Sequence, residues 1–271
     1  MSEELKEHNK MDLVATNWRS LVRPRTVEAS INNTETYGKF VVRPLERGYG
    51  VTVGNTLRRI LLSSLSGAAI TSIRIEGILH EFSSIPSIVE DVTEIVLNLK
   101  GVRIQMGESG PVSARIKVTG AAGGVTNVTA SDIQIMGDAR ILNDDHHIAT
   151  LTEGAVLDVE LEVEMGKGYV PGTQKALEAK SKPHGTIAVD ALFSPIQKVN
   201  YKVTGARVTS ATDYDKLSIE IWSDGSVHPE DALAFAAKIM KEQMQVFINF
   251  HEQVEPVFEE EVSEDEDWNE Y

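Results

Sequence analysis

The sequence predicts an α+β protein in which helices and strands occupy separate stretches of the chain. Between residues 102 and 165, several segments alternate apolar and polar residues, as half-buried strands do. Apolar residues recur at helical spacing near residues 54–64, 88–99 and 229–251. No internal repeat is evident, and these two kinds of segment together indicate the α+β class.

The composition is that of an ordinary globular protein. The chain has 271 residues, of which 41% are hydrophobic and 25% charged, enough for one large or two modest domains. It has no cysteine, which excludes disulfides and thiolate metal sites. The first 20 residues lack the apolar region of a secretory signal, and no apolar run is long enough to span a bilayer. We therefore expect a cytoplasmic protein.

The negative charge is concentrated at the end of the chain. Of a net charge of −15, residues 252–271 supply ten Asp and Glu and no Lys or Arg. Such a run predicts a solvated, disordered tail. An acidic chain is also a poor candidate for binding the phosphate backbone of nucleic acids by itself.

The first elements follow an irregular arm at residues 1–24. Residues 37–43 predict a strand, which we expect Pro44 to end before a glycine-rich loop. A helix is expected from about Gly54 to Ser64, with Leu57 and Leu61 on its apolar stripe. Residues 70–76 alternate again and predict a half-buried strand.

A second helix is predicted after Pro86. Ser87 and Glu90 have the spacing of a capping box, followed by an apolar stripe that ends at Gly101. Residues 166–185 predict a loop.

The last third of the chain predicts a β-hairpin and a long helix. Residues 198–208 and 216–222 are the expected strands, joined near residues 212–215. Pro229 is expected to open a helix that runs to about His251. Its apolar residues cover more than one face, so we expect one face to pack in its own domain and another against a partner subunit.

No catalytic constellation is visible in the sequence. The loop from Gly48 to Gly54 has the spacing GxGxxxG, which is neither a dinucleotide fingerprint nor a P-loop, although a helix N-terminus can bind anions. The run from Asp144 to His147 is too short to form a metal cage by itself, and a polar turn is the simpler interpretation. The pair His80 and Glu81 is more typical of a turn than of a general base.

Arg58 and Arg59 follow the glycine-rich loop. At 3.6 residues per turn, Arg59 projects nearly opposite the apolar stripe and Arg58 lies on its flank. A solvated helix face is the common interpretation. The sharper hypothesis is that Arg59 anchors a second protein, since arginine is favoured at interface hot spots.

The segment LERGYGVTVGNTLRRILLSS (residues 45–64) closely resembles the signature of the bacterial RNA polymerase alpha-subunit family. Five further stretches match in the same order, and the resemblance covers roughly residues 18–250. They are EGILHEFSSI (76–85), VEDVTEIVLNLKG (89–101), GKGYVPG (166–172), VDALFSPIQKVNYKV (189–203) and TDYDKLSIEIWSDGSVHPEDAL (212–233).

The resemblance implies a discontinuous architecture. A dimerisation subdomain of sheet and two helices would comprise residues 18–66 and 195–250, with a β-rich subdomain inserted at residues 67–194. A flexible arm at 1–17 and an acidic tail or linker at 251–271 would flank them. Family members usually continue into a small DNA-binding domain, whereas this chain stops at Tyr271, so direct DNA contact is not expected.

The resemblance also implies partners and contact residues. The dimer would nucleate assembly of the catalytic beta and beta-prime subunits, with sigma and omega reached only through the holoenzyme and with the polymerase on the nucleoid. Beta binding falls on Arg59, with Arg58 beside it, and dimerisation on the two helices. The implied beta-prime residues are Glu94, Lys100, Val189 and Ile196. The implied dimer residues are Leu57, Leu61, Leu233, Met240 and Phe247.

Two other functions stay open at this point. The runner-up is a nucleotide-dependent enzyme that uses the Gly48–Gly54 loop with Arg58 and Arg59. A nucleic-acid-binding module is disfavoured by the acidic body and by the lack of interleaved basic and aromatic residues. For the alpha-subunit hypothesis we expect no cofactor, no metal, no membrane contact and no active site on this chain.

Overall fold

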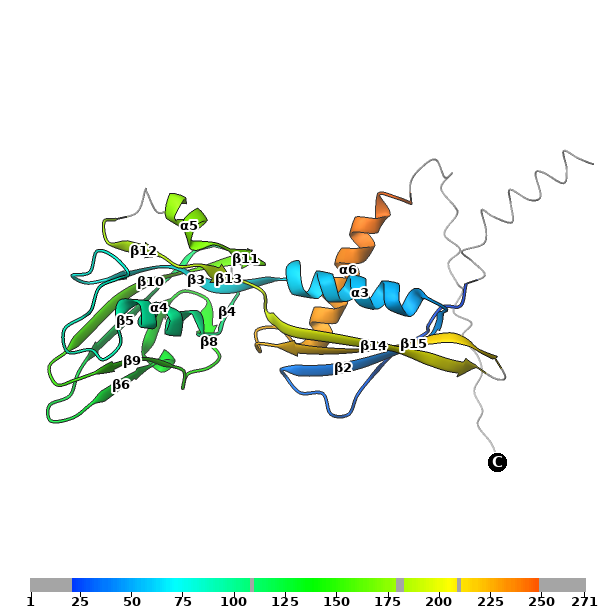
Figure 1. Ribbon diagram of the computed structural model, residues 1–271, viewed down its shortest axis with the longest axis horizontal. Helices are drawn as coiled ribbons and strands as arrows, with labels where there is room; N and C mark the ends of the chain where they lie inside the picture. Colours follow the sequence, from blue (N-terminus) through cyan, green and yellow to red (C-terminus); the bar gives the residue numbers. More distant parts are fainter. Residues whose placement is uncertain (1–20, 108–109, 179–182, 209–210, 249–271) are drawn as a thin grey trace, which may run out of the picture.

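The computed structural model describes residues 21–107, 110–178, 183–208 and 211–248, which form two lobes along the long axis of the molecule (Figure 1). Each lobe has its own hydrophobic core. One lobe is built from two stretches that are far apart in the sequence, and the other from the residues between them. We call them the helix-covered lobe and the inserted lobe.

The helix-covered lobe holds a four-stranded antiparallel sheet with one face under two helices (Figure 1). The strands, in spatial order, are β1 (Val27–Ala29), β2 (Tyr37–Glu46), β15 (Ala211–Ser223) and β14 (Ile196–Val208). The helices are α3 (Tyr49–Ser63), which packs on β14 and β15, and α6 (Pro229–Gln245), which crosses α3. Strands β14 and β15 form the predicted hairpin.

The inserted lobe is β-rich. Its main sheet contains, in spatial order, β12 (Thr186–Ala188), β3 (Ser66–Ile75), β10 (Val156–Lys167), β5 (Val112–Thr119) and β7 (Ile133–Met136). Three two-stranded pairs accompany it: β11 (Tyr169–Val170) with β13 (Ala191–Leu192), β4 (Ile104–Met106) with β8 (Ala139–Ile141), and β6 (Thr126–Thr129) with β9 (His147–Leu151). The helical segments are α4 (Val92–Lys100), α5 (Gly172–Glu178) and a 3₁₀ turn at Ala130–Asp132. The α+β prediction with a β-rich insertion is therefore confirmed.

Strand β2 continues through Pro44 to Glu46, so the prediction that Pro44 ends the strand was wrong. The pairing of β2 with β15 shifts register between Asp215 and Leu217, beside Pro44. A proline is tolerated at such an irregularity because its missing N–H leaves no ladder bond unmade.

Helix α3 begins five residues before the predicted start, because the expected glycine-rich loop is its first turn and a half. Gly50 and Gly54 are buried against the sheet. A Cβ on Gly54 would lie 2.7 Å from the ring of Tyr201, and one on Gly50 would lie 2.8 Å from Val203. These glycines therefore serve close helix–sheet packing.

Helix α4 begins at Val92, and its capping box consists of Asp91 and Glu94 rather than Ser87 and Glu90. Residues 87–90 instead run beside β9, where the Val89 amide donates to the Thr150 carbonyl at 3.0 Å. The predicted helix start was thus displaced by pairing with a strand about 60 residues away, while the predicted end at Gly101 was right.

Two predictions for the chain after residue 165 also differ from the structure, and a third falls partly outside the described residues. The expected loop at 166–185 contains β11 and α5. Strand β15 begins at Ala211, so residues 212–215 lie in the strand rather than in the hairpin connection. Helix α6 starts at Pro229 as predicted and ends at Gln245; the expected end at His251 lies outside the described residues.

Candidate subunit interfaces

The first candidate interface is the exposed face of α3. Leu57 and Leu61 are buried in the core of the helix-covered lobe, so they fix the helix on its own sheet and offer no free surface to a partner. Arg59 is exposed, as the helical wheel predicted, and Arg58 is exposed beside it. Arg59 therefore presents a positive charge to solvent from a helix that is packed firmly on its own sheet.

Two apolar residues on this face escaped the sequence prediction. Val51 and Leu62 are exposed and, at 3.6 residues per turn, lie on the Arg59 side of the helix. The same helical period that places Arg59 on the exposed side also places these two residues there. An arginine flanked by apolar side chains is typical of a protein interface.

The N-terminus of α3 already holds an anion, the carboxylate of Asp215. The amides of Gly48 and Gly50 both donate to Asp215 Oδ2, at 2.9 and 3.1 Å. These are the groups that a bound phosphate would need at a helix N-terminus. The hypothesis of a nucleotide site in this loop therefore loses its main chemical support.

The second candidate interface is a stripe of apolar side chains on α6. Ala232 and Ala236 are buried against the lobe, while Leu233 and Met240 are partly buried on an adjacent stripe. Beyond them the helix extends away from the sheet (Figure 1), and every residue from 241 to 248 is exposed. Met244 and Phe247 continue the stripe of Leu233 and Met240 at helical spacing, with 49% and 67% of their surface exposed.

The third candidate interface surrounds α4. The helix buries Val92, Ile95 and Leu99 and presents its opposite face to solvent. Glu94 and Lys100 lie on the flanks of that face. Leu97 lies between them, with 59% of its surface exposed, and was missed by the sequence prediction although the same wheel places it there.

A hydrogen bond and an ion pair fix the two charged residues on α4. Glu94 accepts from the Asp91 amide at 3.2 Å within the capping box. Lys100 donates to Asp190 Oδ2 at 2.7 Å, and Tyr169 Oη donates to the same oxygen at 3.3 Å. The hydrogen bond from Lys100 lowers the pKa of Asp190, so this carboxylate stays ionised at neutral pH.

Val189 and Ile196 lie near this surface but are buried. Val189 belongs to the core of the inserted lobe, with its amide bonded to the Thr71 carbonyl at 2.9 Å, and Ile196 belongs to the core of the other lobe. What lies open beside them is a cavity of about 330 Å³, lined by Lys100 and Asp190 among others. The side chains of Val189 and Ile196 are therefore not available to contact a partner directly.

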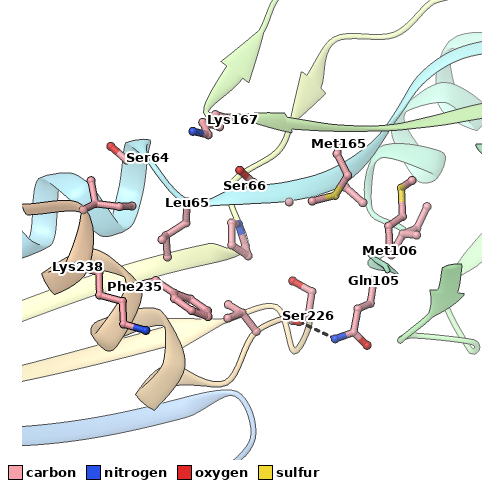
Figure 2. Close-up of a pocket in the computed structure, with 16 residues that line it drawn as sticks. Ser64, Leu65, Ser66, Gln105, Met106, Met165, Lys167, Ser226, Phe235 and Lys238 are labelled. Carbon is pink, nitrogen blue, oxygen red and sulfur yellow. Dashed lines mark hydrogen bonds between the residues drawn. The ribbon is translucent and has the colours of Figure 1, made fainter. Parts of the chain in front are cut away.

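An apolar groove of about 460 Å³ separates the lobes (Figure 2). Met106 and Met165 line it from the inserted lobe and Phe235 from α6. Gln105 Nε2 donates to the Ser226 carbonyl across the junction at 2.8 Å. The lining residues include no Asp, Glu, His or Cys, and their ionisable side chains are those of Lys167 and Lys238.

The described residues gather no three potential metal ligands in one place. His80 bonds to Ser83 Oγ at 3.0 Å on the surface, and the histidines of the Asp144–His147 run bond to different parts of the inserted lobe, described below. Within the same described residues, no helix has the length and apolar character needed to cross a membrane.

A family model and three similar known proteins agree on one family. Residues 73–194 match the family described as the RNA polymerase Rpb3/RpoA insert domain. The DNA-directed RNA polymerase subunit alpha of Geobacter metallireducens is 52% identical over 250 residues, covering 92% of this chain and 72% of that protein. The subunits of the same name from Pelobacter propionicus and Syntrophus aciditrophicus are 52% identical over 251 residues and 51% identical over 260 residues. These alignments cover 92% and 93% of this chain, and 72% and 74% of those proteins.

Proposed function

The chain belongs to the family of bacterial DNA-directed RNA polymerase alpha subunits, and we propose that it forms a homodimer on which the beta and beta-prime subunits assemble. The chain is thus a subunit of the transcription machinery. In this proposal it contributes binding surfaces while its large partners carry the polymerase chemistry. It works in the cytoplasm, on the nucleoid through the polymerase, and meets sigma and omega through the assembled enzyme.

The observation that carries the dimer proposal is the exposed stripe on α6. Full burial of a large apolar side chain at an interface stabilises the complex by roughly 1.5–3 kcal/mol. Met244 stands exposed in the last turn of α6, which projects from its own lobe, and Phe247 stands exposed in the turn that follows the helix. A second copy of the same helix supplies a matching apolar surface, and a two-fold axis uses each contact twice.

The Arg59 face of α3 is proposed as the contact with beta. The guanidinium presents several directed donors to carbonyl or carboxylate groups, and Leu62 and Val51 supply apolar area beside it. The wheel prediction of exposure and the match to the family signature support this choice.

The α4 surface is proposed as the contact with beta-prime. Its solvent face carries Glu94, Leu97 and Lys100, with Lys100 fixed by Asp190. Charged side chains that are held in place lose less entropy on binding than mobile ones. This proposal concerns residues of the inserted lobe, and it is separable from the dimer proposal.

Co-purification with beta and beta-prime, combined with multi-angle light scattering, tests the proposed function. The chain is expected to have the mass of a dimer at micromolar concentration and to capture each large subunit when these are expressed separately. A stable monomer at micromolar concentration would contradict the dimer, and a dimer that captures neither subunit would contradict the scaffold role.

A thermal-shift assay with nucleotides and Mg²⁺ tests the alternative enzyme function. A specific ligand stabilises the folded form by RT ln(1 + [L]/Kd). Since Asp215 already bonds to the α3 amides, no shift is expected. A nucleotide-specific rise in melting temperature would favour the enzyme hypothesis.

A further inference from the structure

Two adjacent histidines, His146 and His147, make contacts near opposite ends of α4: His146 with Asn98 in its last turn, and His147 with Glu90, two residues before its start. They close the run Asp144–His147, whose four polar residues have no role in the proposed function. Adjacent residues entering a strand point in opposite directions. A nine-residue helix is roughly 13 Å long at 1.5 Å per residue. His146, just before β9, reaches the C-terminal end of α4, and His147, the first residue of β9, reaches Glu90 in the segment before the helix.

His146 holds the C-terminal end of α4. Its Nε2 lies 2.8 Å from the Asn98 carbonyl, and because a carbonyl only accepts, Nε2 carries the proton. The ring packs so closely on Gly101 that a Cβ there would lie 2.5 Å from Nε2. Asn143 strengthens this end, since its Nδ2 donates to the Gly101 carbonyl at 3.0 Å.

His147 holds the segment that enters α4, through Glu90. Its Nε2 lies 2.9 Å from Glu90 Oε1, and Glu90 Oε2 accepts from the Thr150 amide at 2.6 Å. Burial opposes ionisation of Glu90, but the hydrogen bonds from His147 and Thr150 outweigh it and lower the pKa. The next residue, Asp91, is the N-cap of α4, so the position of Glu90 sets where the helix starts.

Short helices need such support. A helix of nine residues is marginal in isolation, and its stability comes from tertiary contacts. Val92, Ile95 and Leu99 fix the depth of α4 in the lobe, whereas contacts at its two ends limit sliding and rotation about the helix axis. Rotation would move Glu94 and Lys100 together relative to a partner.

We propose that His146 and His147 are positioning residues, which clamp α4 at both ends and hold Glu94 and Lys100 in the orientation that beta-prime binds. The clamp rests on the proposed function, because the orientation of α4 matters only if beta-prime binds its exposed face. It assigns to the Asp144–His147 run a role that requires neither metal nor catalysis.

The test measures beta-prime affinity of the intact dimer for His146→Leu, His147→Leu and the glutamine variants at both positions. Glutamine keeps a nitrogen donor near the place of Nε2, whereas leucine removes it. We expect each leucine variant to weaken beta-prime binding about tenfold, equivalent to about 1.4 kcal/mol, with faster hydrogen exchange at the α4 amides. Glutamine is expected to restore most of the affinity. His184→Leu, an exposed histidine of another segment, serves as the matched control and should bind normally.

A double-mutant cycle separates positioning from general destabilisation. If the histidines act through Lys100, the loss caused by His146→Leu is smaller in a Lys100→Ala background. Full additivity, equal losses for leucine and glutamine, or normal binding of both leucine variants overturns the clamp. If Glu94→Ala and Lys100→Ala themselves bind beta-prime normally, the proposed surface on α4 is wrong, and the clamp proposal falls with it.

Discussion

Helices α4 and α6 bury side chains of different size: large ones in α4 and small ones in α6. In α4 the fully buried residues are the large Val92, Ile95 and Leu99, whereas in α6 the fully buried ones are Ala232 and Ala236. The large side chains at the end of α6 are the exposed ones. Apart from the exposed Leu97, the large apolar residues of α4 are thus packed within one chain, whereas those at the end of α6 are not. Under the proposed function, this difference predicts an apolar contact for α6 and, for α4, an orientation-dependent contact in which Leu97 lies between the charged Glu94 and Lys100.

The largest expected effect tests the incomplete side of this comparison. Replacing Met244 and Phe247 together by Glu should raise the dissociation constant of the dimer by about three orders of magnitude. The estimate takes about 0.7–1.5 kcal/mol for each of the four side chains in the two protomers, about half the value for full burial because each is already partly buried, and tenfold per 1.4 kcal/mol. Light scattering over a dilution series measures it.

The control for this variant is Gln245→Glu, which adds a charge on the same exposed stretch of α6. It should leave the dimer intact. A dimer that survives both substitutions would place the subunit contact elsewhere. Leu233 is a poorer probe, because it is packed against the core and a charge there would unfold the lobe.

Because Ile95 packs within its own lobe, its replacement predicts a loss of stability without a loss of the dimer. Ile95→Ala removes a fully buried side chain and should lower the free energy of unfolding by about 2–5 kcal/mol. Phe247→Ala, by contrast, should leave the unfolding of the isolated protomer within about 0.5 kcal/mol. Urea denaturation at protein concentrations below the dimer dissociation constant measures the free energy of unfolding of both variants. Equal losses of this free energy would contradict the distinction between the two helices.

The surplus of apolar residues on α6 could be predicted from the sequence, because hydrophobic periodicity is a local property. The start of α6 at Pro229 could be predicted for the same reason. The start of α4 could not, since Ser87 and Glu90 match a capping box locally but are engaged by β9. Likewise, Gly50 and Gly54 suggested a loop, and only their contacts with distant strands explain them as helix residues.

The candidate interfaces could be predicted less well than the fold. Arg59 was placed correctly on the exposed face, and that part depends only on the helix period. Val189 and Ile196 came from family resemblance, which carries no information on burial, and both side chains are inside the cores. Asp190, the partner of Lys100, was missed because an ion pair between residues 90 positions apart leaves no local pattern.

Arg59 is predicted to affect assembly and not folding. Arg59→Ala should weaken beta binding by roughly thirty- to a thousand-fold, or about 2–4 kcal/mol, if the guanidinium is a hot spot in a desolvated interface. The dimer should fold and melt normally, because the residue is exposed. Binding of purified beta to the intact dimer measures this. Arg58→Ala is the neighbouring control and should have a smaller effect; unfolding of the Arg59 variant, or full binding by it, would refute the assignment.

The ion pair between Lys100 and Asp190 predicts a small pH dependence of stability. Lys100 lowers the folded-state pKa of Asp190 below its ordinary value of 3.8. The pair therefore contributes fully above that value, and its contribution is lost as the pH falls through the folded-state pKa. Because both side chains are about one-third exposed, the contribution should stay below about 1 kcal/mol.

Denaturation of the wild type and of Asp190→Asn between pH 3 and pH 7 measures this contribution. The difference between the two proteins should be constant at neutral pH and shrink in acid. Asp145→Asn, at an exposed turn, is the control and should show no such trend. A difference that grows as the pH falls would contradict the sign.

The smallest expected effect concerns the acidic tail. Its deletion tests whether dimerisation through α6 requires residues after 248. Deleting residues 254–271 removes most of the ten acids of the tail and leaves the stripe from Leu233 to Phe247 intact. A segment so rich in like charges buries little apolar area to offset its loss of conformational entropy. The deletion should therefore keep the mass of the dimer and shift the melting temperature by less than about 2 °C, in line with a change of about 0.5 kcal/mol or less. Light scattering and thermal denaturation of the truncated protein, beside the untruncated chain, measure both quantities. A large loss of stability or of dimer would mean that the tail docks on the body, and the exposed face of α6 would then have an occupant within its own chain.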